Sequence, residues 1–371
     1  MPLDKRPRVL LLIPHLGGGG AERVMELLAR GLDRVKYELH LAVITQAEIS
    51  ENSAPNWVHL HALGASRVRT AAFRLLVLVR QLKPDLILSG MFHLNFLVLL
   101  LRPFLPSETR VLVRQNGTVS TSLALGLQPW YTRLLYCLLY RNANRIICQT
   151  RSMAEDLAHE LRLSESRIAV LPNPVNVEEI RGFMSVHPEL KAGSGPHLLS
   201  VGRLSREKGF DLLLRAFFLI RKQYPGASLT IAGTGPEEVR LKADCNTLGL
   251  GTAVDFAGQI AHPWRLFPGA TLFVLSSRNE GMPNALLEAA AGGLPIVALP
   301  ASGGVVELLR GQPGVWLASE ISAEALAASL LDALDSLLPG ERFAHSFVEE
   351  FRMDRAIHAY EELIDRTLKE K

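Results

Sequence analysis

The sequence has few cysteines and no long apolar run. Its three cysteines, Cys137, Cys148 and Cys245, stand far apart in 371 residues and form no C-x-x-C pair. This excludes a disulfide framework and indicates a reducing compartment, in which buried thiols are the usual state. No segment reaches the ~18 uninterrupted apolar residues of a membrane-spanning helix, and the early run from Val9 to Ile13 is too short for a signal peptide. We therefore expect a cytoplasmic protein.

A strong excess of charge is also missing. The formal net charge is +3, although residues 1–180 contain 21 Lys and Arg against 15 Asp and Glu. A positive excess this small excludes the strongly basic surface of a nucleic-acid-binding protein. It suits a protein that contacts an anionic membrane surface or a phosphate-bearing substrate.

Short apolar runs alternate with segments of helical periodicity along the chain. Residues 8–13, 38–44, 85–89 and 110–114 are predicted as buried strands, with helical sequence between most of them. This order is typical of α/β proteins with parallel sheets. At 371 residues and 48% hydrophobic content, the chain suits two such domains. The Gly- and Ser-rich stretch 188–196 is the predicted linker.

A run of four glycines, residues 17–20, follows the first predicted strand. It lacks G-x-G-x-x-G spacing, and the next strand ends at Thr45 without an acidic residue for a ribose, so an NAD-dependent oxidoreductase is excluded. The glycines either let the backbone approach a ligand closely or form a flexible turn. Glu22, just inside the following helix, is interpreted as a charge that complements the helix dipole.

The stretch from Leu275 to Pro300 predicts a strand, a loop and a short helix rich in Ala and Gly. The free N–H groups of a helix's first turn form an anion site at the carboxyl end of a parallel sheet. Glu280 and Glu288 flank this site, and ionised carboxylates are pure acceptors that suit sugar hydroxyls. The alternative makes Glu280 a charge at the helix N-terminus and Glu288 a solvated helix residue.

A second strand-to-helix loop, residues 202–209, contains Arg203 and Lys208. A planar guanidinium grips phosphate with two hydrogen bonds, and Lys adds a point charge. Because glycines bound this loop at a strand's carboxyl end, we favour a phosphate site over a solvated basic loop.

These segments resemble the retaining glycosyltransferases of family 4. The E-x7-E spacing in EGMPNALLEA, the GRLSREKG loop, the GTGP turn at 233–236 and the FAG strand before Gln259 all resemble segments of that family. The resemblance implies the GT-B fold, which is two Rossmann-like domains facing across a cleft. It implies an acceptor-binding domain over residues 1–187, a nucleotide-sugar-binding domain over 188–350 and a C-terminal helix over 351–371 that crosses back to the first domain.

The resemblance also implies roles for individual residues. Arg203 and Lys208 would stabilise the leaving diphosphate, and Glu280 would hold the donor sugar near the reacting carbon. The implied donor-binding residues are Gly18, Gly19, Asn116, Gln259, Ile260, Gly281, Met282, Pro283, Asn284 and Glu288. Many family members place a His where this chain has Arg114, Gln115 and Asn116, so no catalytic His is assigned. Asn116 either bonds to the donor or only forms the turn.

The expected activity is transfer of a sugar from a UDP- or GDP-linked donor to a glycan or polyprenyl-linked acceptor, in polysaccharide or lipid-linked glycan synthesis. No metal or other cofactor is expected, because no D-x-D sequence occurs. A nucleotide-sugar epimerase or phosphorylase and a non-catalytic nucleotide-sugar-binding protein are the alternatives.

Two segments, 94–105 and 130–147, combine apolar bulk with arginine. This mixture suits peripheral docking at the inner face of an anionic membrane. The competing interpretation packs both segments inside the first domain.

Overall fold

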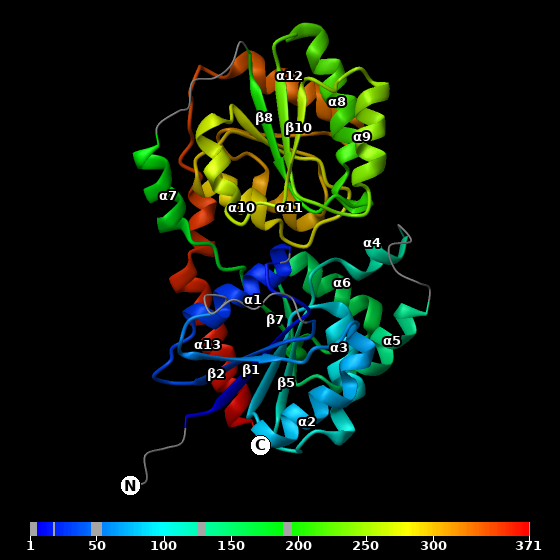
Figure 1. Cartoon of the computed structure of the whole chain (residues 1–371), viewed down its shortest axis with the longest axis vertical. Coiled ribbons are helices and arrows are strands. Elements are labelled where there is room, and N and C mark those ends of the chain that lie inside the picture. Colours follow the sequence, from blue (N-terminus) through cyan, green and yellow to red (C-terminus); the bar gives the residue numbers. More distant parts are fainter. Residues whose placement is uncertain (1–5, 18, 46–53, 125–130, 188–194, 371) are drawn as a thin grey trace. The chain divides into compact units, whose positions relative to one another are not determined.

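The computed structural model describes residues 6–17, 19–45, 54–124, 131–187 and 195–370, and it divides into two compact units (Figure 1). Unit 1 comprises Met1–Pro174 with Met353–Lys371, and unit 2 comprises Val175–Arg352. The chain therefore passes from unit 1 to unit 2 after Pro174, before the predicted domain boundary at residue 187. The reason is α7 (Val177–Val186), whose Val177 and Ile180 are buried in a core cluster of unit 2. Most of the predicted linker lies outside the described residues.

Unit 1 contains a seven-stranded parallel sheet in the order β3-β2-β1-β4-β5-β6-β7. Its strands are β1 (Arg8–Ile13), β2 (Glu38–Val43), β3 (Val58–Ala62), β4 (Leu86–Ser89), β5 (Arg110–Arg114), β6 (Arg145–Cys148) and β7 (Ile168–Val170). Its helices are α1 (Gly20–Gly31), α2 (Ala72–Leu82), α3 (Phe92–Leu100), α4 (Val119–Ala124), α5 (Thr132–Leu139), α6 (Arg151–Leu161) and α13 (Met353–Lys369).

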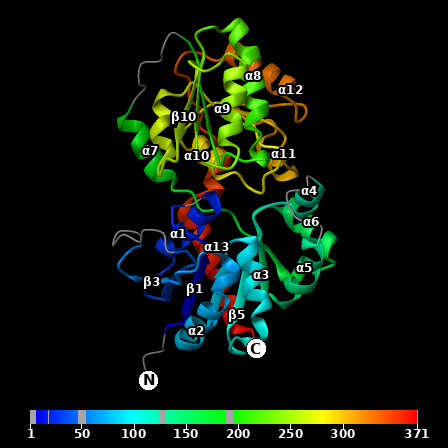
Figure 2. The same ribbon diagram turned by 45° about the vertical axis from the view of Figure 1, so that its right-hand side comes forward.

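Helices cover both faces of this sheet (Figure 2). Leu10 and Leu12 join the core beneath α2, α3, α5 and α6, whereas Val9, Leu11 and Ile13 join the core beneath α1 and α13. Because alternate side chains of a strand point to opposite faces, a strand covered on both sides is a continuous apolar run, as the sequence predicted. The predicted return of the C-terminal helix to the first domain is confirmed by the place of α13 in unit 1.

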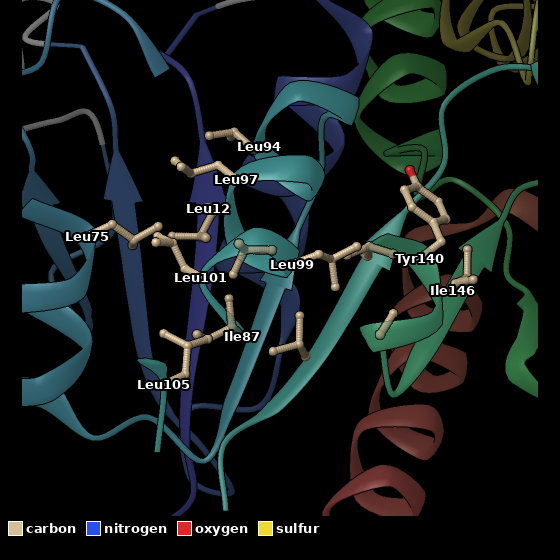
Figure 3. Close-up of a cluster of buried hydrophobic side chains, with 14 of the residues drawn as sticks. Leu12, Leu75, Ile87, Leu94, Leu97, Leu99, Leu101, Leu105, Tyr140 and Ile146 are labelled. Carbon is tan, nitrogen blue, oxygen red and sulfur yellow. The ribbon is translucent and has the colours of Figure 1, made fainter. Parts of the chain in front are cut away.

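The apolar segment 94–105 mostly forms core. Figure 3 shows Leu97, Leu99 and Leu101 close to Leu12 and Ile87 of the sheet. Only side chains that point away from the sheet, such as those of Leu100 and Phe104, are exposed. Within the described residues, no helix is both long and apolar enough to cross a membrane.

Unit 2 contains a six-stranded parallel sheet in the order β10-β9-β8-β11-β12-β13. Its strands are β8 (His197–Val201), β9 (Ser228–Ala232), β10 (Val254–Gly258), β11 (Leu272–Leu275), β12 (Ile296–Ala298) and β13 (Val315–Leu317). Besides α7, its helices are α8 (Phe210–Gln223), α9 (Glu238–Thr247), α10 (Asn284–Ala291), α11 (Gly303–Leu309) and α12 (Ala323–Ser336).

The order of this sheet contains a switch point. From β8 the chain adds β9 and β10 on one side, and it then adds β11, β12 and β13 on the other. The side chains of α8, α9 and α12 pack in one core cluster, while those of α7, α10 and α11 pack in another. In open parallel sheets, ligands bind beyond the carboxyl ends of the strands where the order reverses. That place is where the loops after β8 and β11 begin.

Candidate active site

The loops after β8 and β11, residues 202–209 and 276–283, lie against each other at the switch point. The backbone N–H of Arg278 donates to the carbonyl of Glu207 at 2.7 Å. The hydroxyl of Ser276 donates to the carbonyl of Lys208 at 2.9 Å. Gly209 has φ +64°, and a Cβ at this position would stand 2.0 Å from the carbonyl oxygen of Ser276. Two segments that are distant in the sequence therefore form one structure.

This contact brings two predicted site residues together. Lys208 Nζ lies 2.7 Å from Glu280 Oε1, and the Ser277 hydroxyl donates to the same oxygen at 2.6 Å. Glu280 is 7% exposed. A carboxylate so buried requires a charged or hydrogen-bonded partner, and this one has both. An anionic ligand that reaches Lys208 must therefore compete with Glu280 for it.

Arg203 supplies a second cation in the same loop. Its side chain is exposed, and within the described residues it makes no ion pair or side-chain hydrogen bond. The backbone beside it is fixed, because Leu204 N–H donates to the carbonyl of Thr234 at 2.9 Å. A Cβ on Gly233 would stand 1.9 Å from the carbonyl oxygen of Gly202, so the loop after β9 supports the arginine loop at close range.

The predicted short helix is α10, which begins at Asn284, and the side chain of its N-cap residue, Pro283, makes no capping hydrogen bond. Gly281 and Pro283 precede it as buried residues, and Met282 is partly buried. Glu288 is 7% exposed. It is therefore not the solvated helix residue of the alternative interpretation.

Gln259 and Ile260 follow β10, the edge strand of the sheet. Gln259 is exposed and Ile260 is partly buried. The carbonyl of Gly258 accepts a hydrogen bond from Gly233 N–H at 2.7 Å. This bond joins their loop to the one that supports Arg203.

In unit 1, Asn116 is held by its own neighbours. The Arg114 guanidinium donates to Asn116 Oδ1, and Asn116 Nδ2 donates to the carbonyl of Gly90. These bonds favour the turn-forming interpretation of Asn116. Gly19 is the N-cap residue of α1. Gly18 lies outside the described residues.

Arg114 itself is an unexpected feature, because it is only 2% exposed. It donates to the Tyr360 hydroxyl at 3.2 Å and to the side-chain oxygens of Asn116 and Asn173. All three partners are neutral. The guanidinium links β5, the exit from unit 1 at Asn173 and α13.

Three further residues at the unit 2 site have no motif in the sequence that identifies them: Ser277, Arg278 and Asp211. Arg278 binds Asp211 through two hydrogen bonds, each 2.7 Å long. Burial raises the pKa of Asp211, but the hydrogen bonds and charge of Arg278 outweigh burial and hold that pKa below its ordinary value. The partners are 67 residues apart, so no local pattern in the sequence connects them.

Two protein families match the chain, one in each half. The family described as glycosyltransferase family 4 matches residues 18–179, and the family described as glycosyl transferases group 1 matches residues 186–350.

Individual relatives agree with these matches. An uncharacterized glycosyltransferase of Methanocaldococcus jannaschii is 25% identical over 66% of this chain, which spans 62% of that relative's length. N-acetylgalactosamine-N,N'-diacetylbacillosaminyl-diphospho-undecaprenol 4-alpha-N-acetylgalactosaminyltransferase of Campylobacter jejuni is 26% identical, over 91% of this chain and 92% of its own. A crystal structure of Anabaena HepE with UDP and glucose has a TM-score of 0.75 at 16% identity, and covers 96% of this chain and 99% of that one. From the two family matches and the likeness of fold, this chain belongs to the GT-B glycosyltransferases of the family 4 type.

Proposed function

We propose that the protein transfers a sugar from a nucleotide-sugar donor to an acceptor hydroxyl, with retention at the anomeric carbon. The observation that carries this proposal is the contact of Lys208 with Glu280 at the switch point of unit 2, beside Arg203. The site thus joins cations for a diphosphate to a carboxylate for sugar hydroxyls.

The chemical difficulty is the departure of a nucleoside diphosphate with growing negative charge. Fixed positive groups aimed at that charge stabilise the transition state. Arg203 and Lys208 bind the diphosphate, and the first-turn N–H groups of α10 add the positive end of a helix dipole. When Lys208 turns to the diphosphate, Glu280 becomes available to hydroxyls of the donor sugar. Glu288 holds the ribose, and Gln259 and Ile260 border the base.

Two relatives support the choice of substrates. Anabaena HepE was crystallised with UDP-glucose, which supports a nucleotide-sugar donor. We propose that this donor is UDP- or GDP-linked. The Campylobacter relative's name includes a diphospho-undecaprenol acceptor, which supports a polyprenyl-linked or other glycan acceptor. We therefore assign the protein to polysaccharide or lipid-linked glycan synthesis.

Alanine substitution tests the diphosphate site. We expect Arg203→Ala and Lys208→Ala each to lower kcat/KM at least about tenfold, which corresponds to ~1.4 kcal/mol. Arg215→Ala, on the exposed side of α8, is the charge-matched control. Initial rates with a panel of nucleotide-sugars provide the measurement. Unchanged rates in both variants, with unchanged affinity for nucleoside diphosphate, would refute the assignment.

The same assay separates the alternative activities. An epimerase or phosphorylase would convert the nucleotide-sugar without the glycan acceptor, and a phosphorylase would also need inorganic phosphate. A non-catalytic protein would bind the nucleotide-sugar without turnover. Product analysis with and without acceptor distinguishes all three from a transferase.

We also propose that transfer needs no metal ion. Arg203 and Lys208 supply the positive charge that a carboxylate-bound cation provides elsewhere, and the sequence contains no D-x-D. Transfer is therefore expected to continue at an unchanged rate in excess EDTA. Strict restoration of a lost rate by Mg²⁺ or Mn²⁺ would contradict this expectation.

The outer face of α5 supports the proposal of peripheral membrane docking. Tyr136 and Tyr140 are buried, but Leu134 and Leu138 on the same segment are exposed. Beside them lies a hollow of about 500 Å³, lined by Arg133, Leu134, Cys137, Arg141, Glu160, Leu161 and Arg162. Apolar side chains between arginines suit an anionic bilayer surface, where each cation contributes ~1 kcal/mol.

Vesicle sedimentation tests this docking. We expect binding to vesicles with anionic phospholipid, weakened by salt and weakened further by Arg133→Glu with Arg141→Glu. The double variant Arg215→Glu with Lys222→Glu, at two exposed positions of α8 in unit 2, makes the same number of charge reversals and is expected to have little effect. Binding that is absent at low salt, or indifferent to Arg133 and Arg141, would leave α5 as a helix of the core alone.

A further inference from the structure

Arg278 joins the two site loops and also reaches helix α8, which follows one of them. Its guanidinium donates twice to Asp211 and once, at 3.0 Å, to the carbonyl of Arg206. Its backbone N–H donates to Glu207. One residue of the loop after β11 therefore grips both the loop after β8 and the first turn of α8.

These contacts are made by residues that stand next to the proposed catalytic residues in the sequence. Lys208 follows Arg206 and Glu207, and Glu280 stands two positions after Arg278. Lys208 and Glu280 are 72 residues apart, so no covalent neighbour fixes their separation. Their 2.7 Å contact depends on how the two loops are held together.

We propose that Arg278 and Asp211 are a positioning pair, which sets the loop of the phosphate-binding Lys208 against Glu280. This inference rests on the proposed function. Neither residue of the pair touches the substrate in this assignment. Their role is to fix where the diphosphate's cation stands relative to the carboxylate that receives the sugar.

The geometry suits such a role. A guanidinium fork bound to a carboxylate by two parallel hydrogen bonds fixes orientation as well as distance. The side chains are 21% and 19% exposed, so water screens the pair less than an ion pair on the surface. Asp211 also stands in the first turn of α8, where the helix dipole favours a negative charge. Misplacing reacting groups by about 1 Å costs on the order of 100-fold in rate.

The experiment compares Arg278→Ala with the wild type in transfer rate, affinity for nucleoside diphosphate and Tm. We expect kcat to fall about 10- to 100-fold. Affinity for UDP or GDP should change less than about threefold, because Arg203 and Lys208 both remain. Added guanidinium at a non-denaturing concentration should restore part of the rate, because it can occupy the position beside Asp211. Asp211→Asn should lower kcat similarly, and the double variant should be no slower than the single ones, since one pair is lost in each case.

Arg181→Ala is the matched control. Arg181 pairs with Glu349 at 2.6 Å in the same unit, away from both site loops, and its loss should leave kcat unchanged. The inference is overturned if Arg278→Ala retains the wild-type kcat, or if its activity falls only with the unfolded fraction and guanidinium restores none. A wild-type protein that neither binds nucleoside diphosphate nor transfers sugar would instead contradict the proposed function.

Discussion

Replacing Glu280 with Gln is expected to lower sugar transfer by roughly 100-fold and to tighten binding of the nucleoside diphosphate alone. Both effects follow from the 2.7 Å contact of Glu280 with Lys208. The neutral amide cannot neutralise the lysine, so an entering diphosphate meets a free cation and no repelling carboxylate. Transfer falls because the amide holds the donor hydroxyls and the charge of the reacting sugar less well.

Calorimetric titration with UDP and GDP, beside initial rates of transfer, measures the two effects separately. Glu324→Gln, on the exposed first turn of α12, removes a carboxylate elsewhere in unit 2 and should change neither quantity. Weaker binding of the diphosphate to Glu280→Gln would mean that Glu280 supports the anion site and does not compete with it. Wild-type transfer would remove Glu280 from the mechanism.

Gly233→Ala is expected to cause the largest loss of stability among substitutions at the site. The added Cβ would stand 1.9 Å from the carbonyl oxygen of Gly202, and the backbone at φ +143° disfavours any side chain. Because the backbone fixes the position of the Cβ and the carbonyl oxygen belongs to the backbone, no rotamer change relieves this conflict. We expect a loss of more than about 4 kcal/mol in unfolding free energy, seen as insoluble protein or a greatly lowered Tm.

Gly249→Ala separates the two causes of this loss. Gly249 also has positive φ, +70°, but nothing lies within 4 Å of the added Cβ. It should cost only about 1–2 kcal/mol, the backbone strain alone. Similar Tm values for the two variants would show that the contact between Gly233 and Gly202 relaxes easily.

The sequence predicted much of the fold because parallel strands covered on both faces leave a simple pattern. Val9 to Ile13 is such a run, and it forms β1. The division between the units was predicted less well. Gly and Ser at 188–196 suggested a linker, but the burial of Val177 and Ile180 against unit 2 decides where α7 belongs. Tertiary packing of this kind has no local signature.

The candidate site, like the fold, could be predicted only in part from the sequence. Arg203, Lys208 and Glu280 stand in short glycine-containing loops, which local sequence can identify. Their supporting contacts cannot be identified in this manner, because Arg278 and Asp211 meet only after β8 and β11 become neighbours in the sheet. Asn116 also shows what local sequence cannot predict. Its side-chain amide forms hydrogen bonds with Arg114 and Gly90, and these depend on the fold of unit 1.

The place of α13 in unit 1 has a consequence for synthesis on the ribosome. Ile357, Tyr360, Leu363 and Ile364 complete the apolar core beside α1, yet they are translated after the whole of unit 2. Domains generally fold as units during translation, with the earlier one first. Until α13 is synthesised, one face of the sheet formed by residues 1–174 stays partly uncovered. Val175–Arg352 is synthesised as a continuous segment in the meantime and can fold first. Unit 1 can therefore complete its core only after the whole of unit 2 has been synthesised, so the unit that begins first is completed last.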